Sequence, residues 1–325
     1  MKAILLDGFG DESVMRLGEA PAPELTPGAL RLRVAATAVN RADLMQRKGH
    51  YPPPPGAPDI LGLECAGEVI ELGEGVTGWS RGDRAMALLA GGGYAEEVVV
   101  DAGSALPIPA SMDFERAAAV PEVFITVFLK VFQLGGLRDG GSVLVHGGGS
   151  GIGTTTIQLV KHVGGTVVVT AGSDEKCARC RDLGADVAVD YREGDFVAAA
   201  QEATGGRGVD IVLDSIGAPY LERNLKALAP DGRLVILGLM GGAKAEISLG
   251  LVVAKRLQVI GSTLRARPVA EKAEFVRRFQ ERFGHALEKG EIGPVVDRVL
   301  PLAEAAEAHR VVAASEHFGK VVLRV

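Results

Sequence analysis

The sequence has few cysteines, no excess of basic charge and no long hydrophobic run. Its three cysteines, Cys65, Cys177 and Cys180, cannot build a disulfide framework. Lys and Arg total 35 against 41 Asp and Glu, a formal charge of −6, so no global field attracts nucleic acid. The N-terminus holds an apolar run of only four residues, and no stretch approaches the ~18 apolar residues of a membrane span. We therefore expect a cytoplasmic protein that binds neither nucleic acid nor membranes.

The residues that are present predict a globular protein of about two domains. Hydrophobic residues make up 47% of the 325 residues and charged residues 23%, which is enough for a substantial core. Residues 1–120 hold short β-rich runs punctuated by Gly and Pro, which predicts a barrel-like β domain. Residues 121–264 alternate strands with helices, which predicts βαβ units and a parallel, doubly wound sheet, an α/β fold. Residues 265–325 hold an amphipathic helix and two strands that need partners, and we expect this segment to return to the first domain.

A glycine-rich loop lies between a predicted strand, 142–146, and a predicted helix. Aligned to the G-x-G-x-x-G pattern, its three positions are Gly148, Ser150 and Gly153. Glycines let the backbone approach a pyrophosphate, and the helix N-terminus supplies free N–H groups and a positive dipole end. The sequence therefore predicts a dinucleotide site. The residues expected to hold the pyrophosphate are Ser150, Gly151, Ile152 and Gly153.

The end of the second strand of the alternating region indicates which dinucleotide binds. An NAD site usually places Asp or Glu there, bonded to the ribose 2′-hydroxyl, but Thr170-Ala171-Gly172-Ser173 has no carboxylate. Asp174 and Glu175 count against a 2′-phosphate, although carboxylates are also typical of a first helical turn capped by serine. We predict NADPH. The residues expected to bind its adenosine ribose and 2′-phosphate are Gly172, Ser173, Lys176 and Tyr191.

Several motifs resemble a known superfamily. The runs Val39–Leu44, Gly62–Val69 and Gly82–Arg84, with the glycine loop, resemble the medium-chain dehydrogenase/reductases. The run from Gly151 to Lys161 is similar to that of their quinone oxidoreductase (zeta-crystallin-like) branch. Pro121-Glu122, Ala171–Ser173 and Gly238–Gly242 resemble, more narrowly, the tumour-suppressor-inducible quinone oxidoreductases. The resemblance covers nearly the whole chain. It implies a GroES-like β-barrel catalytic domain joined to a Rossmann domain, with the cofactor in the cleft, and a homodimer paired through the Rossmann sheet edges.

The resemblance also implies which residues form the catalytic site. It places Asn40 beside the nicotinamide, with Asp43 orienting the Asn40 segment. Tyr51, on a proline-rich loop, would cover the acceptor or donate a hydrogen bond to a forming quinolate, although a core or interface tyrosine is the alternative. The further contacts expected at the nicotinamide end are Thr126, Leu239, Met240, Leu264 and Ser315.

Zinc ligands are missing at the positions where zinc-dependent relatives carry them. Those relatives hold zinc through a Cys near the Asn40 position, a His beside the Glu64 position and a later Cys, whereas this chain has Leu63 where that His would stand. We therefore expect no metal. Cys177 and Cys180 form an isolated CxxC on a predicted helix, and we interpret them as helix residues.

Without a Lewis acid, the sequence predicts hydride transfer from NADPH to an acceptor that is already electrophilic, a small quinone-like molecule. Two alternatives stay open. One is reduction of an activated C=C bond in an enone or enoyl thioester. The basic mouth of a thioester site would be supplied by Arg41, Arg47, Lys48, Arg265 and Arg267. The other alternative is a non-catalytic NADPH-binding protein.

Overall fold

The computed structural model describes residues 1–325, which divide into two compact units. Unit 1 comprises Met1–Ile125 and Leu264–Val325, and unit 2 comprises Thr126–Thr263. Each unit has its own main sheet and its own buried apolar cluster.

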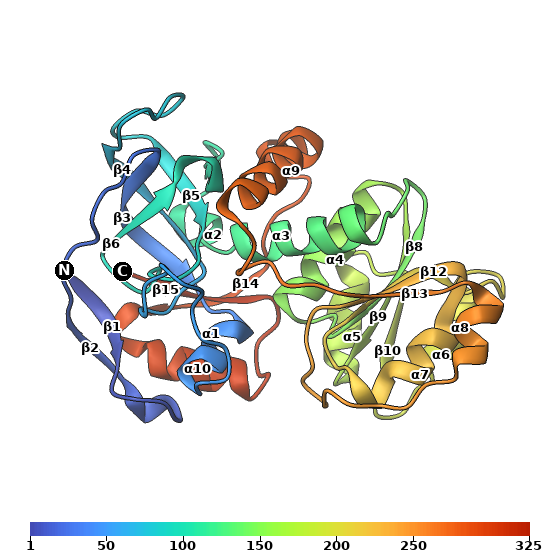
Figure 1. Ribbon diagram of the computed structural model, residues 1–325. Coiled ribbons are helices and arrows are strands. Elements are labelled where there is room, and N and C mark those ends of the chain that lie inside the picture. Colours follow the sequence, from blue (N-terminus) through green and yellow to red (C-terminus); the bar gives the residue numbers. More distant parts are fainter. The chain divides into compact units, whose positions relative to one another are not determined.

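Unit 1 is built mainly of β-strands, drawn in blue, cyan and red in Figure 1. Its strands are β1 (Lys2–Leu6), β2 (Met15–Glu19), β3 (Ala29–Ala38), β4 (Glu64–Leu72), β5 (Arg84–Leu88), β6 (Glu97–Asp101), β7 (Ala105–Pro107), β14 (Val296–Pro301) and β15 (Lys320–Arg324). The seven-stranded sheet has the order β14-β15-β3-β4-β5-β7, with β6 also paired to β3, and β1–β2 form a separate hairpin. Neighbours in the large sheet run antiparallel except β14 and β15.

Alternation along β3 sets the register of this sheet. Leu30, Leu32 and Val34 are buried, whereas Arg31 and Arg33 form ion pairs with glutamates of neighbouring strands. Burying such an apolar side chain contributes ~1.5–3 kcal/mol, and a slip of one residue would expose all three.

The helices of unit 1 are short, with one exception. They are α1 (Arg41–Arg47), α2 (Phe114–Ala117), α9 (Val269–Lys289) and α10 (Ala305–Ala313), while α3 (Pro121–Val127) begins in unit 1 and ends in unit 2. Short 3₁₀ turns cover Glu12–Val14, Ala102–Ser104 and Leu302–Glu304. The long α9 is amphipathic and buries Val276, Phe279 and Phe283, as the sequence predicts for a helix around 268–288.

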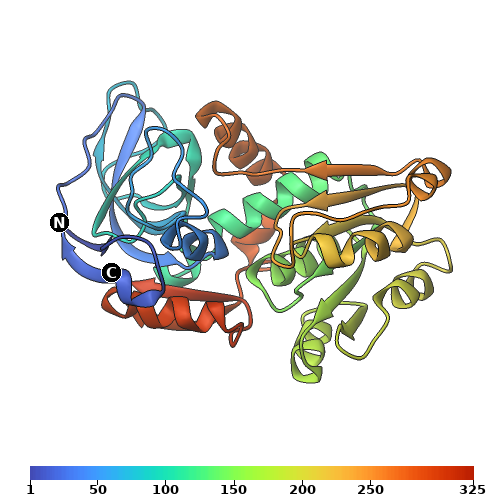
Figure 2. The ribbon, with the colours of Figure 1, turned by 60° about the horizontal axis from the view of Figure 1, so that its bottom comes forward.

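Unit 2 is a six-stranded parallel sheet with helices between its strands. The strands are β8 (Ser142–His146), β9 (Thr166–Ala171), β10 (Val187–Asp190), β11 (Val209–Asp214), β12 (Leu228–Ile236) and β13 (Gln258–Gly261). The helices are α4 (Gly151–His162), α5 (Asp174–Asp182), α6 (Phe196–Ala203), α7 (Leu221–Ala227) and α8 (Leu249–Lys255), with a 3₁₀ turn at Ala218–Tyr220. The order β10-β9-β8-β11-β12-β13 reverses direction between β8 and β11, and Figure 2 shows the helices packed along the strands. The predicted parallel, doubly wound sheet is confirmed.

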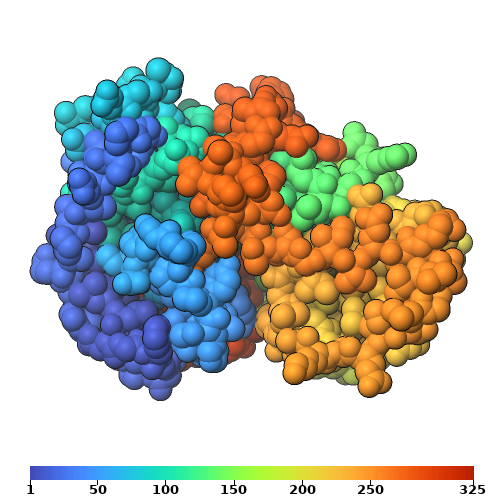
Figure 3. Space-filling model, in the orientation of Figure 1, coloured from blue at the N-terminus to red at the C-terminus, as the bar shows by residue number.

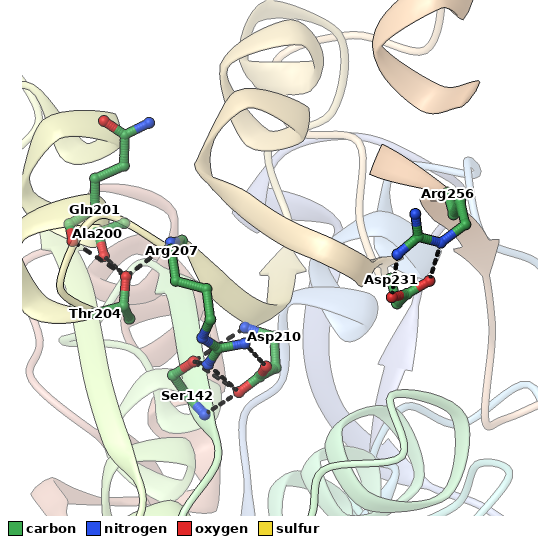
Figure 4. Close-up of polar contacts among 9 residues, drawn as sticks. Ser142, Ala200, Gln201, Thr204, Arg207, Asp210, Asp231 and Arg256 are labelled. Atoms are coloured by element: carbon green, nitrogen blue, oxygen red, sulfur yellow. Dashed lines mark hydrogen bonds and ion pairs between the residues drawn. The ribbon is translucent and has the colours of Figure 1, made fainter. Parts of the chain in front are cut away.

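Polar side chains fix the amino ends of the central strands of unit 2 (Figure 4). The Asp210 carboxylate accepts from the Ser142 N–H at 2.7 Å and from its hydroxyl at 2.8 Å, and Arg207 pairs with the same carboxylate at 2.6 Å. Arg256 and Asp231 form a second ion pair at 2.7 Å. Asp231 lies within β12, and Arg256 lies just before β13. These contacts lie at the opposite edge of the sheet from the glycine loop, which follows the carboxyl end of β8.

The segment Phe114–Leu134 corrects the expectation about membrane-spanning stretches. Phe114–Leu134 is long and apolar enough to cross a membrane by length and composition, with a mean hydropathy of 1.6, so the expectation that no stretch approaches this length is wrong. Four charged residues interrupt the apolar ones, at Glu115, Arg116, Glu122 and Lys130, which hides the segment from a search for consecutive apolar residues. In the structure 83% of its apolar window is buried, and α2, α3 and a π-helix (Phe128–Leu134) divide it.

Most other differences lie at element ends or in short elements. The sequence predicts a strand at 233–237, whereas β12 begins at Leu228, where Val209 of β11 pairs with it before an irregularity in the register. Helices α1, α8 and α10, each of seven to nine residues, were not expected.

Candidate functional site

The glycine loop of unit 2 joins the end of β8 to the start of α4. Ser150 caps the helix, because its hydroxyl accepts from the Gly153 N–H at 3.0 Å and donates to the Gly147 carbonyl at 2.7 Å. A Cβ at position 153 would overlap the backbone of Gly147 and Gly148, so this position requires glycine. The serine in the middle of the motif thus replaces a glycine with a capping side chain and keeps the turn closed.

The first turn of α4 is suited to an anion. Gly151, Ile152 and Gly153 form this turn, and the first N–H groups of a helix have no partner within it. No acidic side chain lies in the turn, so the positive end of the helix dipole is not neutralised. The turn can therefore hold a phosphate group through backbone donors.

A second cluster lies at the neighbouring ends of β9 and β10. Ser173 caps α5, its hydroxyl accepting from the Lys176 N–H at 3.2 Å. The hydroxyl of Tyr191 lies 3.0 Å from the place that a Cβ on Gly172 would occupy, so the ring lies against this glycine. The structure thus brings together Gly172, Ser173, Lys176 and Tyr191, which the sequence predicts as one binding site. The Tyr191 side chain is 46% exposed and remains accessible to a ligand.

The remaining predicted residues of unit 2 divide into exposed and buried ones. Leu239 and Met240 are 53% and 56% exposed on the loop that follows β12. The Met240 N–H donates to the Ser215 carbonyl at 3.1 Å, so this loop lies beside the end of β11, at the same carboxyl edge as the glycine loop. Thr126 is buried in α3.

His146 ends β8 and is a buried, neutral histidine. Its Nε2 lies 2.7 Å from the Asn224 Oδ1 and its Nδ1 lies 3.0 Å from the Thr170 hydroxyl. An amide oxygen only accepts, so Nε2 carries the proton. Burial lowers the pKa of His146 to about 4, which leaves it uncharged at neutral pH. These contacts give it a structural role beneath the glycine loop.

In unit 1, Asn40 lies between the end of β3 and the start of α1. The Asp43 carboxylate accepts from the Asn40 N–H at 2.7 Å and from the Gly62 N–H at 3.2 Å. Asp43 therefore ties the start of α1 to the segment that leads into β4, and this brings the predicted pair Asn40 and Asp43 together.

The Asn40 side chain lies between two charged groups that sequence reasoning did not identify as site residues. Its Nδ2 donates to the Glu64 Oε1 at 2.8 Å and to the Ala38 carbonyl at 3.3 Å, while its Oδ1 accepts from the Lys320 ammonium at 2.6 Å. Lys320 and Glu64 also form an ion pair at 2.8 Å, with side-chain exposures of 4% and 0%. The sequence carries a signal for both residues, because Glu64 and Lys320 are charged residues that begin apolar strands, β4 and β15. A charged side chain at such a position is rarely buried unless it is paired.

A series of buried hydrogen bonds leads from Arg47 to the Asp43 carboxylate. An Arg47 N–H donates to the His309 Nδ1 at 3.2 Å, so the Nε2 proton of His309 points toward the Tyr94 hydroxyl, 3.1 Å away. Tyr94 in turn donates to the Asp43 carboxylate at 3.4 Å. Burial, with the Arg47 charge, lowers the pKa of His309 to about 3, so this histidine stays neutral. At its outer end Arg47 pairs with Glu12 at 2.8 Å.

Tyr51 belongs to another group of contacts in unit 1. The Arg265 guanidinium lies 5.4 Å from the centre of its ring, donates to the Tyr51 carbonyl at 3.3 Å and donates to the Gln46 amide oxygen at 2.7 Å. Arg265 was not predicted as part of the catalytic site, yet it fixes the proline-rich loop. Burial raises the pKa of Tyr51, which keeps its hydroxyl protonated at neutral pH.

Two further predicted residues of unit 1 differ in their surroundings. Leu264 is 4% exposed and packs in the interior. Ser315 follows α10 with φ of +55°, a left-handed conformation that non-glycine residues seldom adopt. The Arg41 guanidinium reaches its hydroxyl at 3.4 Å and the Val312 carbonyl at 3.1 Å, which stabilises this turn.

The cysteines lie in apolar surroundings. Cys65, Cys177 and Cys180 are all buried free thiols. Burial raises the pKa of each, to about 12 for Cys180, so the thiolate form that binds metals or attacks disulfides is disfavoured. Across residues 1–325, no three His, Cys, Asp or Glu side chains lie close enough together to hold a metal ion.

Asp43 gives a testable pH dependence. Burial raises its pKa to about 6, from an ordinary value near 3.9, so the folded chain binds more protons than the unfolded chain between these pH values. Stability therefore falls as pH rises through this window, by about 3 kcal/mol. The measurement is the free energy of unfolding of the wild type minus that of Asp43→Asn, obtained from urea titrations at a series of pH values. We expect this difference to decrease from pH 4 to pH 6 and to stay level above pH 6.

Asp190 provides a control, because its contribution to stability should change with pH in the opposite direction. The Arg192 side chain lowers the pKa of Asp190 to about 2, so the corresponding difference for Asp190→Asn should rise with pH below pH 4. A level difference for Asp43→Asn across pH 4–6 would contradict the assignment.

Family models match parts of both units. Residues 26–110 match the alcohol dehydrogenase GroES-like domain, and residues 151–281 match the zinc-binding dehydrogenase family. The first match covers most of the unit 1 sheet, which confirms the expected GroES-like domain. The second begins at the first residue of α4 and covers the rest of the parallel sheet.

Relatives and solved structures match the whole chain. The synaptic vesicle membrane protein VAT-1 homolog of Rattus norvegicus is 33% identical, over 99% of this chain and 84% of that protein. The structure of an NAD-dependent alcohol dehydrogenase is 34% identical, with a TM-score of 0.88 and full coverage of both chains. The structure of Escherichia coli quinone oxidoreductase complexed with NADPH is 28% identical, with a TM-score of 0.89 and full coverage of both chains. The chain therefore belongs to the medium-chain dehydrogenase/reductase family of oxidoreductases.

Proposed function

We propose that this chain is an NADPH-dependent, zinc-independent oxidoreductase that transfers a hydride from NADPH to a quinone or a similarly electrophilic acceptor. The observation that carries the coenzyme assignment is the cluster at the ends of β9 and β10. Lys176 and Tyr191 lie there with the Ser173 cap, and no carboxylate replaces Gly172 at the strand end. A 2′-phosphate fits this cluster, because a nearby cation and a hydroxyl donor stabilise its charge.

Zinc independence is supported by the surroundings of Asn40. Leu63, at the position of the histidine ligand of zinc-dependent relatives, is an apolar residue and 1% exposed. The Glu64 carboxylate already accepts from Asn40 and from the Glu122 N–H, and pairs with Lys320. A site built in this way has no imidazole or thiolate for a zinc ion.

The proposed chemistry assigns separate tasks to the two units. When bound, NADPH supplies the hydride, and a quinone that accepts it becomes a quinolate that needs one proton. The first turn of α4 would hold the pyrophosphate, and the cluster around Lys176 would hold the adenosine phosphate. Thr126, Leu239, Met240, Leu264 and Ser315 remain proposed contacts at the nicotinamide end. Tyr51, held by Arg265 and protonated at neutral pH, would donate a hydrogen bond to the quinolate oxygen.

The structure offers little support for a carrier-bound enoyl thioester as substrate. Most of the basic residues that would form the mouth of that site are engaged elsewhere. Arg47 is buried against Glu12 and His309, Arg265 holds the proline-rich loop, and Arg267 pairs with Glu271. Reduction of small enones remains the second candidate, because the same hydride chemistry serves both acceptors.

We propose a cytoplasmic location. Its support is that 83% of the apolar window in Phe114–Leu134 is buried inside the protein, where it cannot contact lipid. Fractionation of cells that express the chain, with the protein recovered in the membrane pellet after a salt wash, would contradict this proposal.

The first test is steady-state oxidation of NADPH and, separately, of NADH, with an ortho-quinone as acceptor and a chelator present. We expect turnover that prefers NADPH and does not respond to the chelator. Tight NADPH binding without quinone turnover would contradict the assignment of a quinone as acceptor, and enones would be assayed next. Binding without turnover of either acceptor would identify a non-catalytic NADPH-binding protein.

The coenzyme cluster gives a second test. We expect Lys176→Ala to raise the Kd of NADPH about tenfold, the size of one charge-assisted contact at ~1.4 kcal/mol, and to leave the Kd of NADH unchanged. The matched control is Lys161→Ala, because Lys161 lies on α4 and pairs with Asp186 at 2.8 Å. Equal NADPH affinities of wild type and Lys176→Ala, measured by fluorescence titration, would remove Lys176 from the site.

The edge of the parallel sheet supports a homodimer. β13 is the last strand of the sheet and has no neighbour on its outer side. Val259 on this strand is 46% exposed, and Leu249 and Val253 on the adjacent α8 are 69% and 75% exposed. Figure 3 shows orange residues of this region at the surface of unit 2. An exposed apolar edge strand is a template for pairing with a second copy.

The dimer is tested by sedimentation. We expect the wild type to sediment as a dimer at micromolar concentration and Val259→Lys to sediment as a monomer, because the charge disrupts pairing along the edge. Leu17→Lys, at a 44% exposed position of β2, is the matched control and should remain dimeric. A monomeric wild type would refute the proposal.

A further inference from the structure

The orientation of the Asn40 amide is determined by its two charged neighbours. The Lys320 ammonium is donor-only, so the group 2.6 Å from it must be the oxygen of the Asn40 amide. The Glu64 carboxylate is acceptor-only when ionised, so the group 2.8 Å from it must be the nitrogen. An asparagine between two neutral partners can turn its amide over, but here each end faces a partner of fixed polarity.

The same contacts decide which hydrogen-bonding capacity Asn40 keeps. Its two N–H donors are both used, one by Glu64 and one by the Ala38 carbonyl. Its oxygen has two lone pairs, and Lys320 occupies one. Asn40 therefore keeps one acceptor site and no donor, and its exposure of 9% leaves room for one further contact.

Lys320 is in turn held in place. Its ammonium donates to the Val39 carbonyl at 2.9 Å and to the Asn40 oxygen, and it pairs with Glu64, so all three of its protons have partners. The second Glu64 oxygen accepts from the Glu122 N–H at 2.8 Å. Neither charge can turn away from Asn40 without leaving a buried group unpaired, which is costly.

We propose that Lys320 and Glu64 are positioning residues that make Asn40 an acceptor-only group for the ligand beside it. This rests on the proposed function, in which Asn40 lies at the nicotinamide. The group that Asn40 recognises is then an N–H donor, the carboxamide NH₂ of the coenzyme, and a quinolate oxygen must receive its hydrogen bond from another residue. Lys320 and Glu64 thereby determine that the site prefers a coenzyme with a carboxamide donor.

The test compares two coenzymes that differ in this donor. The reduced 3-acetylpyridine analogue of NADPH carries a methyl ketone where NADPH carries the carboxamide, so it offers no N–H. We expect the wild type to bind NADPH about tenfold more tightly than the analogue, because the analogue leaves the Asn40 oxygen short of a donor. Dissociation constants are measured by fluorescence titration and need no turnover.

The informative variant is the double substitution Lys320→Met with Glu64→Gln. It removes both buried charges together, so neither is left unpaired, and it removes the fixed polarity on both sides of Asn40. We expect the preference for NADPH to fall to about threefold or less. Glu64→Gln alone retains Lys320 and should keep most of the wild-type preference. Arg31→Met, which removes an ion-paired cation at the other end of β3, should keep all of it.

The outcomes separate this inference from the proposed function. A wild type that binds NADPH and the analogue equally overturns the inference and leaves the function standing, as does a folded double variant with undiminished preference. A wild type that binds neither coenzyme overturns both. Circular dichroism of each variant, with Lys320→Leu/Glu64→Gln as a second neutral pair, establishes that a lost preference belongs to a folded protein.

Discussion

The pairing of β15 with β3 is the constraint on which the candidate catalytic site depends. Val322 pairs with Ala38 and Leu323 with Thr37, and the Val39 N–H donates to the Val321 carbonyl at 2.9 Å. This pairing brings Lys320 beside Asn40, from which 280 residues separate it in the sequence. Residues close to each end of the chain thus build one site, and closing a loop of that length costs little more entropy than closing a shorter one.

Buried charge around Asn40 contributes orientation rather than stability. An ion pair as buried as Glu64–Lys320 recovers its desolvation cost only when further hydrogen bonds satisfy the remaining donors and acceptors, and here the Val39 carbonyl, the Asn40 amide and the Glu122 N–H do so. An apolar pair would serve stability equally well. What the charges add is polarity, because each admits only one orientation of the amide between them.

The proposed coenzyme site of unit 2 depends on backbone groups and helix caps as well as on the charge of Lys176. The first turn of α4 presents N–H groups, and Ser150 and Ser173 cap the two helices that start at the carboxyl edge of the sheet. Backbone donors need no buried ions, so this part of the site follows from strand order and glycine placement. Local sequence patterns can therefore indicate that Gly172, Ser173, Lys176 and Tyr191 lie at neighbouring strand ends, while their contact with the coenzyme stays a prediction.

The sequence by itself determined the parallel doubly wound sheet, the capped glycine loop and the cluster at the ends of β9 and β10, because each is set by periodicity, helix caps and glycines within a few residues of one another. It also placed Asn40 and Asp43 together, three residues apart on one turn. Only the tertiary structure decided the roles of Lys320, Glu64, Tyr94 and His309, and the hold of Arg265 on Tyr51. These partners are separated by long stretches of chain, and no local pattern records which buried charge meets which amide; strand pairing and burial decide it.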